Sequence, residues 1–542
     1  MSLKLKSMSL ILCSCLLFGC TTSNNQNSQP QNSTQSSTEE SSTKPAEVTY
    51  EKAELPVLSI QTKNQDANVL DFVTEPVATH VAEAIASWTP GYQIPPAPYY
   101  EACSISLTNA DQTAALSNVD AEVKVRGNWT TTYDKKPLRI KFAEKQNLLG
   151  LNDGAEMRNW VLLAGYKDAS MLRDKAALEI ARELLGKDGL YAADAEFVEV
   201  YINEQYWGVY LLTELQQVNK DRVDISEPEA DYTGTDIGYF LEFDGYFYNE
   251  DPLHQFHVDY ADNAKLTPYD GQGGNDRSMC CLPITWSDNR KDVGFTIKSE
   301  IYSQEQHDFI ASYVNNVFRI LYAAAYEDKA YGFNDAYTEI EENTQITPQQ
   351  AVEAVINVDS LADMYLISEL TCDADIYWSS FYMDVDFGAE GSKKLTFEAP
   401  WDFDSGLGNK DRCADGTGFY AANIVPDVDG GPQNGGYYTI NPWLAVLMYE
   451  DWYQDIIREK WSALYDSGVL ERTVTMVQKD AAQYADAFTK NYDKWDNIRN
   501  NASFAMELSK QAANCKNHTE ASAFLAEWLQ NRISFLNEHW HK

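Results

Sequence analysis

The chain is 542 residues long and strongly acidic, with 82 Asp and Glu against 42 Lys and Arg and a formal net charge of −40 at pH 7. Contacts to nucleic-acid phosphates depend on Lys and Arg, so this charge excludes DNA or RNA as an expected partner. Hydrophobic residues make up 44% of the chain, which is enough for a large folded core. Basic proteins and metal-bridged anions fit such a negative field better.

The N-terminus has the pattern of an export signal. Lys4 and Lys6 precede a short apolar run that ends in LFGC at residues 17–20, which resembles a bacterial lipobox. Residues 1–19 are therefore predicted to be a lipoprotein signal peptide, with Cys20 as the lipidated residue. An ordinary signal peptide cleaved nearby is the alternative, and both interpretations imply export.

A polar tether is predicted over residues 20–46, because this segment is rich in Ser, Thr, Asn and Gln and holds no apolar anchor for a core. No later segment has the long apolar run of a transmembrane helix. We therefore expect an exported protein, anchored by its lipid to the outer face of the cell membrane or the cell surface. The sequence leaves open the disulfide pairing of the six remaining cysteines, Cys103, Cys280, Cys281, Cys372, Cys413 and Cys515.

The body of the chain is predicted to be α+β. Residues 47–232 read as a β-rich lobe, because apolar and polar positions alternate in several segments. Its one principal helix is expected over residues 170–185, with Ser170 as the cap. A hairpin with its turn at Asn203-Glu204 follows. The predicted strands before that helix are 55–62, 102–109, 121–129 and 136–142.

Residues 233–542 are predicted to form a mainly helical lobe. A strand is expected at 238–244 and a long helix from near Gln304. Ser360 and Asp363 have the spacing of a capping box. Further helical periodicity covers residues 442–465, 471–488 and 519–540.

A carboxylate-rich hairpin is predicted within about residues 370–409. A strand at 379–386 is followed by a return strand that leads into Asp402 and Asp404. This folding would bring Asp375 and Asp402 to the same end of the hairpin. Two carboxylates there could bind a divalent cation, or one could act as a base while the other binds the metal. A simple turn is the alternative, since Asp and Gly are turn residues.

Basic residues are concentrated in the segment from Arg126 to Lys141. Phosphoryl transfer needs such cationic groups near the phosphates. Lys135 and Lys136 lie where the second strand of this segment begins, and Arg139 shares a strand face with Lys141. Edge strands protected by lysines would explain Lys135 and Lys136, but they explain the other basic residues less well.

Four collinear segments resemble the CotH (spore coat protein H) kinase family. They are VRGNWT…KKPLRIKF, LLGL…RNWVLLAGYKDASMLRDKAALEIAREL, VEVYINEQYWGVYLLTE and SSFYMDVD…PWDFDSGLGN. The resemblance implies an atypical protein-kinase-like fold with two lobes. It also implies phosphate transfer from ATP to protein Ser or Thr with Mg²⁺ or Mn²⁺ as the metal.

Site residues follow from the same resemblance. Asp375 takes the catalytic position, Asp402 the metal-binding position and Asp404 an auxiliary metal contact. Ser380 stands where kinases place a metal-binding Asn. Glu179 is an alternative ion-pair partner for the nucleotide-binding lysine. The candidates for nucleotide binding are Arg126, Lys136, Arg139, Lys141, Glu214 and Glu242.

The leading hypothesis is therefore an exported kinase that phosphorylates a basic, Ser/Thr-rich protein. The alternative is a surface-anchored binding or scaffolding module with weak or no catalysis, since the hydroxyl of Ser380 is a poorer magnesium ligand than an amide. A metal-dependent glycosidase that uses Asp402 with Asp375 is a third hypothesis, supported only by paired carboxylates and aromatic residues.

Overall fold

A computed structural model describes residues 50–260, 266–271, 293–410, 414–426, 438–498 and 507–542. The predicted signal peptide, its Cys20 and the tether lie outside the described residues, as do Cys280, Cys281 and Cys413. The described residues all belong to one compact unit. Within the described part of the chain, none of the helices combines the length and apolarity that crossing a bilayer requires.

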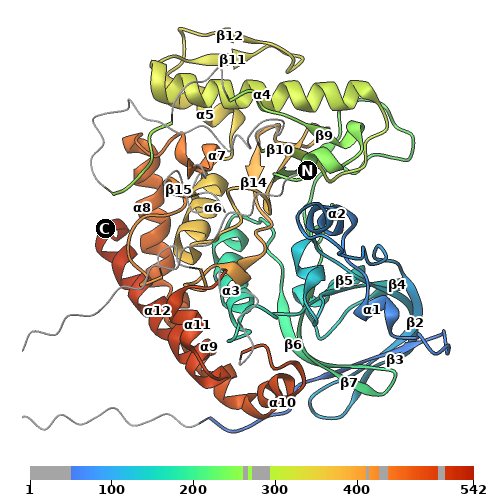
Figure 1. Ribbon diagram of the computed structural model, residues 1–542. Coiled ribbons are helices and arrows are strands. Elements are labelled where there is room, and N and C mark those ends of the chain that lie inside the picture. The colour runs from blue at the N-terminus through green and yellow to red at the C-terminus, as the bar shows by residue number, and fades with distance from the viewer. Residues whose placement is uncertain (1–49, 261–265, 272–292, 411–413, 427–437, 499–506) are drawn as a thin grey trace, which may run out of the picture. The chain divides into compact units, whose positions relative to one another are not determined.

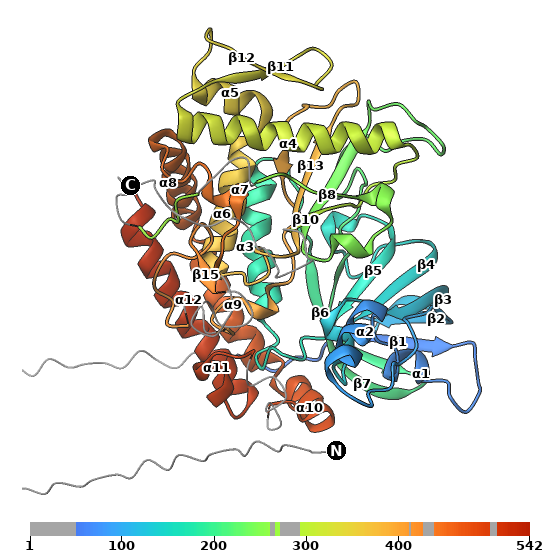
Figure 2. The ribbon, with the colours of Figure 1, turned by 45° about the horizontal axis from the view of Figure 1, so that its top comes forward.

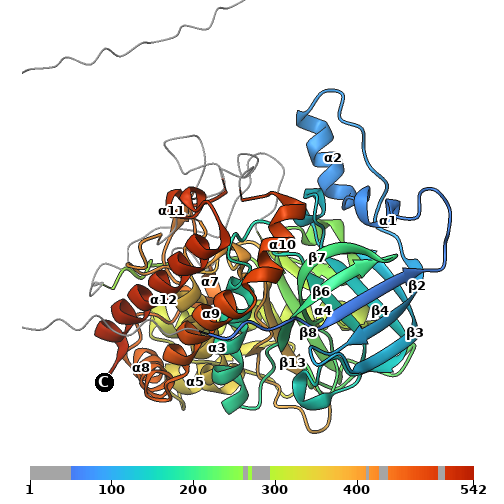
Figure 3. The ribbon, with the colours of Figure 1, turned by 90° about the horizontal axis from the view of Figure 1, so that it is seen from below.

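The N-terminal half holds a closed seven-stranded barrel in the order β1-β2-β3-β4-β5-β7-β6 (Figures 1 and 3). Neighbours are antiparallel except β1 and β6, which pair in parallel and close the ring. Alternating residues such as Cys103, Ile105 and Leu107 fill the interior, as period-two patterning predicts. The strands are Val57–Thr62, Glu101–Thr108, Ala114–Val125, Leu138–Gln146, Met157–Leu163, Ala195–Ile202 and Gln205–Glu214.

Short helices lie between the barrel strands. The β6–β7 turn at Asn203-Glu204 is confirmed, with positive φ at both residues. The predicted helix is α3, but Ser170 as its cap is wrong. The carboxylate of Asp168 accepts the N–H of Arg173 at 3.0 Å. The helices of this half are α1 (Asp71–Thr74), α2 (Thr79–Trp88), η1 (Trp129–Thr132), η2 (Asn152–Gly154) and α3 (Arg173–Lys187).

A second, five-stranded sheet has the order β14-β13-β8-β10-β9. It contains the predicted hairpin, in which Met383 on β13 pairs with Phe397 on β14. The rings of Tyr239 on β8 and Phe309 on α4 pack 6.1 Å apart, and Figure 2 shows these elements. The strands are β8 (Gly238–Asp244), β9 (Gln255–Phe256), β10 (Gly294–Ile297), β13 (Phe381–Asp386) and β14 (Thr396–Phe397). Two short helices, η3 (Phe247–Asn249) and η4 (Pro252–His254), precede β9.

The C-terminal half is mainly helical, which confirms an α+β fold. The capping box at Ser360 is wrong, because Asn357 accepts the N–H of Ser360 and starts α6 three residues earlier. The helices are α4 (Gln304–Glu327), α5 (Pro348–Val355), α6 (Val358–Thr371), η6 (Phe403–Ser405), α7 (Pro442–Ala445), α8 (Asp451–Asp466), α9 (Val469–Gln483), α10 (Ala485–Trp495), α11 (Lys510–Asn514) and α12 (His518–Trp540). Two small ribbons pair β11 (Tyr331–Phe333) with β12 (Ile340–Glu342) and β15 (Val425–Pro426) with β16 (Tyr438–Thr439).

The helix α3 connects the two halves. It packs on β6 of the barrel and on α6, α9 and η6 of the later part. Nine of its fifteen residues are buried, because apolar side chains face both partners. The predicted domain boundary near residue 232 falls between β7 and β8 and stays a prediction.

Candidate active site

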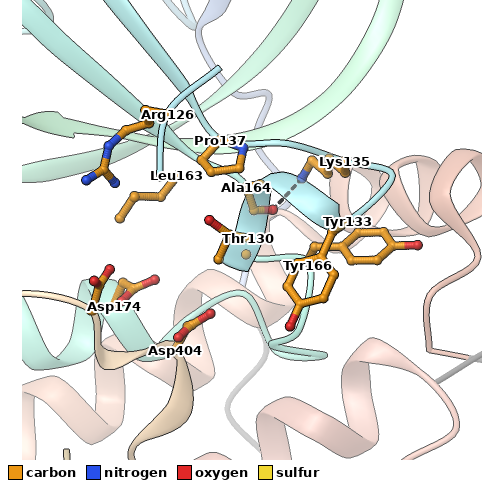
Figure 4. Close-up of a pocket in the computed structure, with 12 residues that line it drawn as sticks. Arg126, Thr130, Tyr133, Lys135, Pro137, Leu163, Ala164, Tyr166, Asp174 and Asp404 are labelled. Carbon is orange, nitrogen blue, oxygen red and sulfur yellow. Dashed lines mark hydrogen bonds between the residues drawn. The ribbon is translucent and has the colours of Figure 1, made fainter. Parts of the chain in front are cut away.

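A cleft opens where one end of the barrel meets the turn after β14. It is partly open to solvent. Arg126 reaches toward the end of the cleft where Asp174 lies, and Tyr133 and Tyr166 lie at the other end (Figure 4). The lining residues are Arg126, Thr130, Tyr133, Lys135, Pro137, Leu163, Ala164, Gly165, Tyr166, Asp174, Asp402 and Asp404.

The backbone beside the cleft is strained at several non-glycine residues. Asp402 has a φ of 64° and Ser380 a φ of 58°. Ala399 and Leu407, close to the same turn, also lie in the left-handed region with φ of 60° and 46°. Such conformations cost about 1–3 kcal/mol each and persist where the surrounding structure fixes them, often at functional sites.

Asp402 is held by the residue that precedes β13. The hydroxyl of Ser380 donates a hydrogen bond to Oδ2 of Asp402 at 2.8 Å. Burial raises the pKa of Asp402 to about 7, although the Arg126 guanidinium opposes this rise. Repulsion from Asp375 and Asp404 raises the same pKa further. Asp402 thus lies in a cluster of carboxylates whose negative charge the nearby cations offset only in part.

Asp404 faces a buried ammonium group. Nζ of Lys167 lies 3.5 Å from Oδ1 of Asp404 and 3.8 Å from Oε2 of Glu507, and it donates to Oγ of Ser405 at 2.5 Å. The hydroxyl of Tyr133 donates to Glu507 at 3.0 Å. Burial alone would lower the pKa of Lys167, but Asp404 and Tyr133 raise it above its ordinary value.

Asp174 adds a third carboxylate to the cleft. It lies in the first turn of α3, and its Oδ1 accepts the backbone N–H of Phe403 at 3.0 Å. This bond fixes the turn between Asp402 and Asp404 to the helix. Burial, reinforced by repulsion from these two carboxylates, raises the pKa of Asp174 well above its ordinary value.

Asp375 lies in the loop between α6 and β13 and is partly exposed. Its backbone N–H donates to Oδ1 of Asp373 at 3.0 Å. Burial raises the pKa of Asp373 well above its ordinary value, and the charge of Asp375 adds to this rise. The hairpin therefore places Asp375 within electrostatic reach of Asp402, as the sequence predicts.

Arg126 supplies the positive charge on the barrel side. Its guanidinium lies 5.4 Å from the ring centroid of Trp401, a stacking geometry that leaves its N–H groups available. Among the residues that the structure describes, no carboxylate lies within 4.0 Å of this guanidinium. Arg126 is thus a cleft-lining cation with unused hydrogen-bond donors.

The other predicted basic candidates make contacts elsewhere. Lys136 donates to the carbonyl oxygens of Thr131 and Tyr133 at 2.5 and 2.9 Å, and burial lowers its pKa. Arg139 donates to Oδ1 of Asn159 at 2.8 Å. The ammonium of Lys141 lies 5.9 Å from the ring centroid of Tyr100. None of the three lines the cleft described above.

Lys135 does line the cleft, but its ammonium points into the protein. It donates to the carbonyl oxygens of Ala164, at 2.7 Å, and Val209, and it lies 4.4 Å from the ring centroid of Tyr210. Burial lowers the pKa of Lys135 well below its ordinary value. These contacts hold the loop before β4 against the barrel.

Two predicted glutamates have different surroundings. Glu214 is fully buried in an ion pair with Arg222 at 3.1 Å, away from the lining residues. Glu242 pairs with Lys298 at 2.9 Å and accepts the N–H of Ser380 at 3.1 Å. Glu242 therefore contacts Ser380, whose hydroxyl donates to Asp402. Glu179, the alternative partner, is exposed on α3.

Sequence reasoning missed Lys167 and Asp174 as site residues. Both belong to the segment YKDASMLRD at residues 166–174, of which the helical pattern assigns residues 170–174 to the start of a helix. The available signal is one lysine and two aspartates, Asp168 and Asp174, clustered around that start. The contacts of Lys167 and Asp174 to residues 403–405 cannot be predicted without the tertiary fold.

The carboxylates that line the cleft are chemically suited to a divalent cation. Carboxylate oxygens are the ligands that Mg²⁺ and Mn²⁺ prefer, and the raised pKa values of Asp402 and Asp174 reflect negative charge that a cation would offset. Within the described ranges, no three His, Cys, Asp or Glu side chains form a ready-made metal group. Mg²⁺ sites often consist of one or two carboxylates completed by substrate phosphates, which is the arrangement available here.

The sequence from residue 123 to residue 536 matches a family model described as CotH kinase protein. The match begins within β3 and runs through the cleft residues into α12. The chain therefore belongs to the CotH kinase family, as the four collinear segments predict. No curated protein matches the sequence.

Proposed function

We propose that the protein is an ATP-dependent kinase that phosphorylates Ser or Thr of another protein. The observation that carries the proposal is the cleft itself. Arg126, a cation with unused donors, faces the same cleft as the three carboxylates Asp174, Asp402 and Asp404. Family membership supports a kinase-like activity. The barrel and the helical half would be the two lobes of an atypical kinase fold.

Each residue has a role that its position supports. Arg126 would bind nucleotide phosphate through its guanidinium, a geometry suited to phosphate oxygens. Asp402 and Asp404 would hold Mg²⁺ or Mn²⁺, with Ser380 orienting Asp402. A bound cation would supply charge neutralisation on the phosphate oxygens. Asp375 would orient the acceptor hydroxyl by accepting its hydrogen bond.

The substrate class follows from charge. The chain carries a net charge of −40, so a basic, Ser/Thr-rich protein would be attracted to it over a Debye length of about 8–10 Å. We further propose that the protein is exported and anchored through Cys20, which places its substrate among exported or surface proteins. The lipobox at residues 17–20 supports this part of the proposal.

Phosphate transfer from γ-labelled ATP to a Lys/Arg- and Ser-rich acceptor protein tests the proposal. The assay needs Mn²⁺ or Mg²⁺ and the variants Asp402→Asn and Asp375→Asn. Asp66→Asn is the matched control, because Asp66 is exposed and far in sequence from the cleft residues. We expect wild type and Asp66→Asn to label the acceptor and the other two variants to lose at least about 99% of the rate.

Two results would change the conclusion. Nucleotide binding without any transfer would favour the inactive binding module. Neither binding nor transfer would overturn the nucleotide interpretation of the cleft.

A further inference from the structure

Lys167 lies between the barrel and the turn that carries Asp402 and Asp404. It sits in the loop between β5 and α3, and its side chain is only 9% exposed. Its ammonium contacts Ser405 and Asp404, more than 230 residues later in the chain. A buried ammonium is costly unless it is paired and hydrogen-bonded, so the quality of the contacts made by Lys167 matters.

The ion pairs of Lys167 are loose. Its Nζ lies 3.5 Å from Asp404 and 3.8 Å from Glu507, both longer than the 2.7–3.2 Å of an N–H···O hydrogen bond. By comparison, Lys175 on α3 lies 2.9 and 3.0 Å from its two carboxylates. Among the described residues, the Ser405 hydroxyl alone lies within hydrogen-bond distance of the Lys167 ammonium. An ammonium has three donors, so Lys167 retains capacity for another acceptor.

The surroundings of Lys167 indicate which acceptor. It lies beside Asp404, which would bind the metal, and within the electrostatic reach of Asp375, which would orient the acceptor hydroxyl. Arg126 lines the cleft together with Asp402 and Asp404. Lys167 lies behind the lining residues and contacts Asp404, so a group transferred between Asp404 and Asp375 would pass next to Lys167.

We propose that Lys167 binds the terminal phosphate of the nucleotide, in exchange for its loose contact with Glu507. The proposal rests on the proposed kinase function and assigns the γ-phosphate contact to a loop lysine rather than to a barrel-strand lysine. Arg126 then serves the phosphates that remain in ADP, so the two cations have separable effects on ATP and ADP.

Lys167 keeps its proton throughout the transfer. The bond between the γ-phosphorus and the β–γ bridging oxygen breaks, and its electron pair leaves with ADP. A new bond forms between the γ-phosphorus and the acceptor hydroxyl oxygen, whose proton passes to Asp375. Lys167 donates hydrogen bonds to the γ-phosphoryl oxygens before and after this step, which adds charge stabilisation without proton exchange.

Calorimetric affinities of ATP and ADP, measured with Mn²⁺ for wild type and Lys167→Met, test the proposal. We expect wild type to prefer ATP, and Lys167→Met to weaken ATP binding about tenfold to a hundredfold while changing ADP binding less than threefold. Lys175→Met is the matched control, since it also removes a buried ammonium. It is expected to keep the ATP preference even if it lowers stability.

Glu507→Gln tests the exchange independently of how Lys167→Met folds. Glu507 is 28% exposed, and removing its charge frees Lys167, so the preference for ATP over ADP should increase. An unchanged preference in both Lys167→Met and Glu507→Gln would overturn the assignment of Lys167 alone. Absence of any nucleotide binding by wild type would instead overturn the proposed function, and with it this assignment.

Discussion

Ser380 donates a hydrogen bond to Asp402 at 2.8 Å across the open end of the β13–β14 hairpin. Both residues have left-handed backbone conformations, and the N–H of Ser380 is fixed by Glu242 at 3.1 Å. The serine at the position where kinases place a metal-binding Asn therefore contacts Asp402 directly. Its structural task is to orient Asp402.

Ser380→Ala removes this orienting bond. Partners of metal-binding carboxylates typically contribute ten- to a hundredfold to metal affinity, so we expect Mn²⁺ binding in the presence of ATP to weaken by about tenfold. Ser380→Asn suits the left-handed backbone of this position and keeps a hydrogen-bond donor, so it should retain most of the affinity. Titration of Mn²⁺ followed by electron paramagnetic resonance measures both. Equal affinities for wild type and Ser380→Ala would show that Asp402 needs no support from this residue.

Arg126→Ala removes the cleft-lining guanidinium. We expect ATP and ADP to bind about tenfold to a hundredfold more weakly, because a charge-assisted contact of about 1.5–3 kcal/mol is lost for both. Arg158→Ala is the matched control, since Arg158 is an exposed arginine of the same barrel that pairs with Glu144 at 3.4 Å. Calorimetry distinguishes the two, and equal losses in both variants would contradict a specific role for Arg126.

Asp174→Asn keeps an acceptor for the Phe403 N–H but removes a carboxylate whose pKa is raised well above its ordinary value by burial and by its neighbours. The charged form is disfavoured in the fold, so the variant should gain roughly 1–3 kcal/mol of stability at pH 8 without divalent cations. Mn²⁺ affinity should fall at the same time. Thermal unfolding at pH 8 and pH 4 checks the first point, because the cost of a carboxyl pKa raised by the fold shrinks as the pH falls toward its ordinary value of 3.8.

The Glu369–Arg532 pair connects α6 to α12 with both side chains fully buried. Glu369 also accepts the N–H groups of Tyr420 and Ala421 at 2.8 and 2.9 Å. Arg532→Met leaves a buried carboxylate without its cation, which should cost about 3–5 kcal/mol. The double variant Glu369→Gln/Arg532→Met should recover part of the loss. Urea unfolding provides the values, and a loss below about 1 kcal/mol in the single variant would contradict this role.

His518 makes stability depend on pH. Burial lowers its pKa to about 4, and its ring stacks on Phe488 with centroids 4.1 Å apart. Between pH 6.5 and 4 the unfolded chain binds more protons at this residue than the folded chain does. The contribution is therefore fully present above pH 6.5 and is lost as pH falls through about 4, with a size of roughly 3 kcal/mol.

His518→Gln tests this contribution. The variant should be less stable than wild type at pH 7, and the difference in unfolding free energy should shrink when both are measured at pH 4.5. A difference that stays constant between the two pH values would show that the imidazole proton is not responsible.

Much of the fold was predictable, because the spacing of apolar residues within one segment indicates whether that segment forms a strand or a helix. Alternation identified most barrel strands and the β13–β14 hairpin, and helical spacing identified α3, α4 and α12. Barrel closure by the parallel pairing of β1 with β6 depends on contacts between distant segments, which alternation does not encode. Caps were harder: α6 is capped by Asn357 instead of Ser360, and α3 has Leu172 at its N-cap, while Asp168 accepts the N–H of Arg173 in its first turn.

The site was predictable in part for the same reason. Asp375 and Asp402 come together because a short hairpin connects them. Lys167 reaches Asp404 only through the packing of α3 against η6, so this contact cannot be predicted from the sequence. Arg139 looked equivalent to Arg126, but the strand alternation gives it Asn159 as a partner.

The most direct measurement for the central claim is the affinity of ATP for wild type and Asp402→Asn, each with Mn²⁺ and with a chelator. We expect wild type to bind ATP at least tenfold more tightly with Mn²⁺, and Asp402→Asn to lose this dependence while its fold is retained. Equal ATP affinity with and without Mn²⁺ in both proteins would contradict a metal–nucleotide site at Asp402.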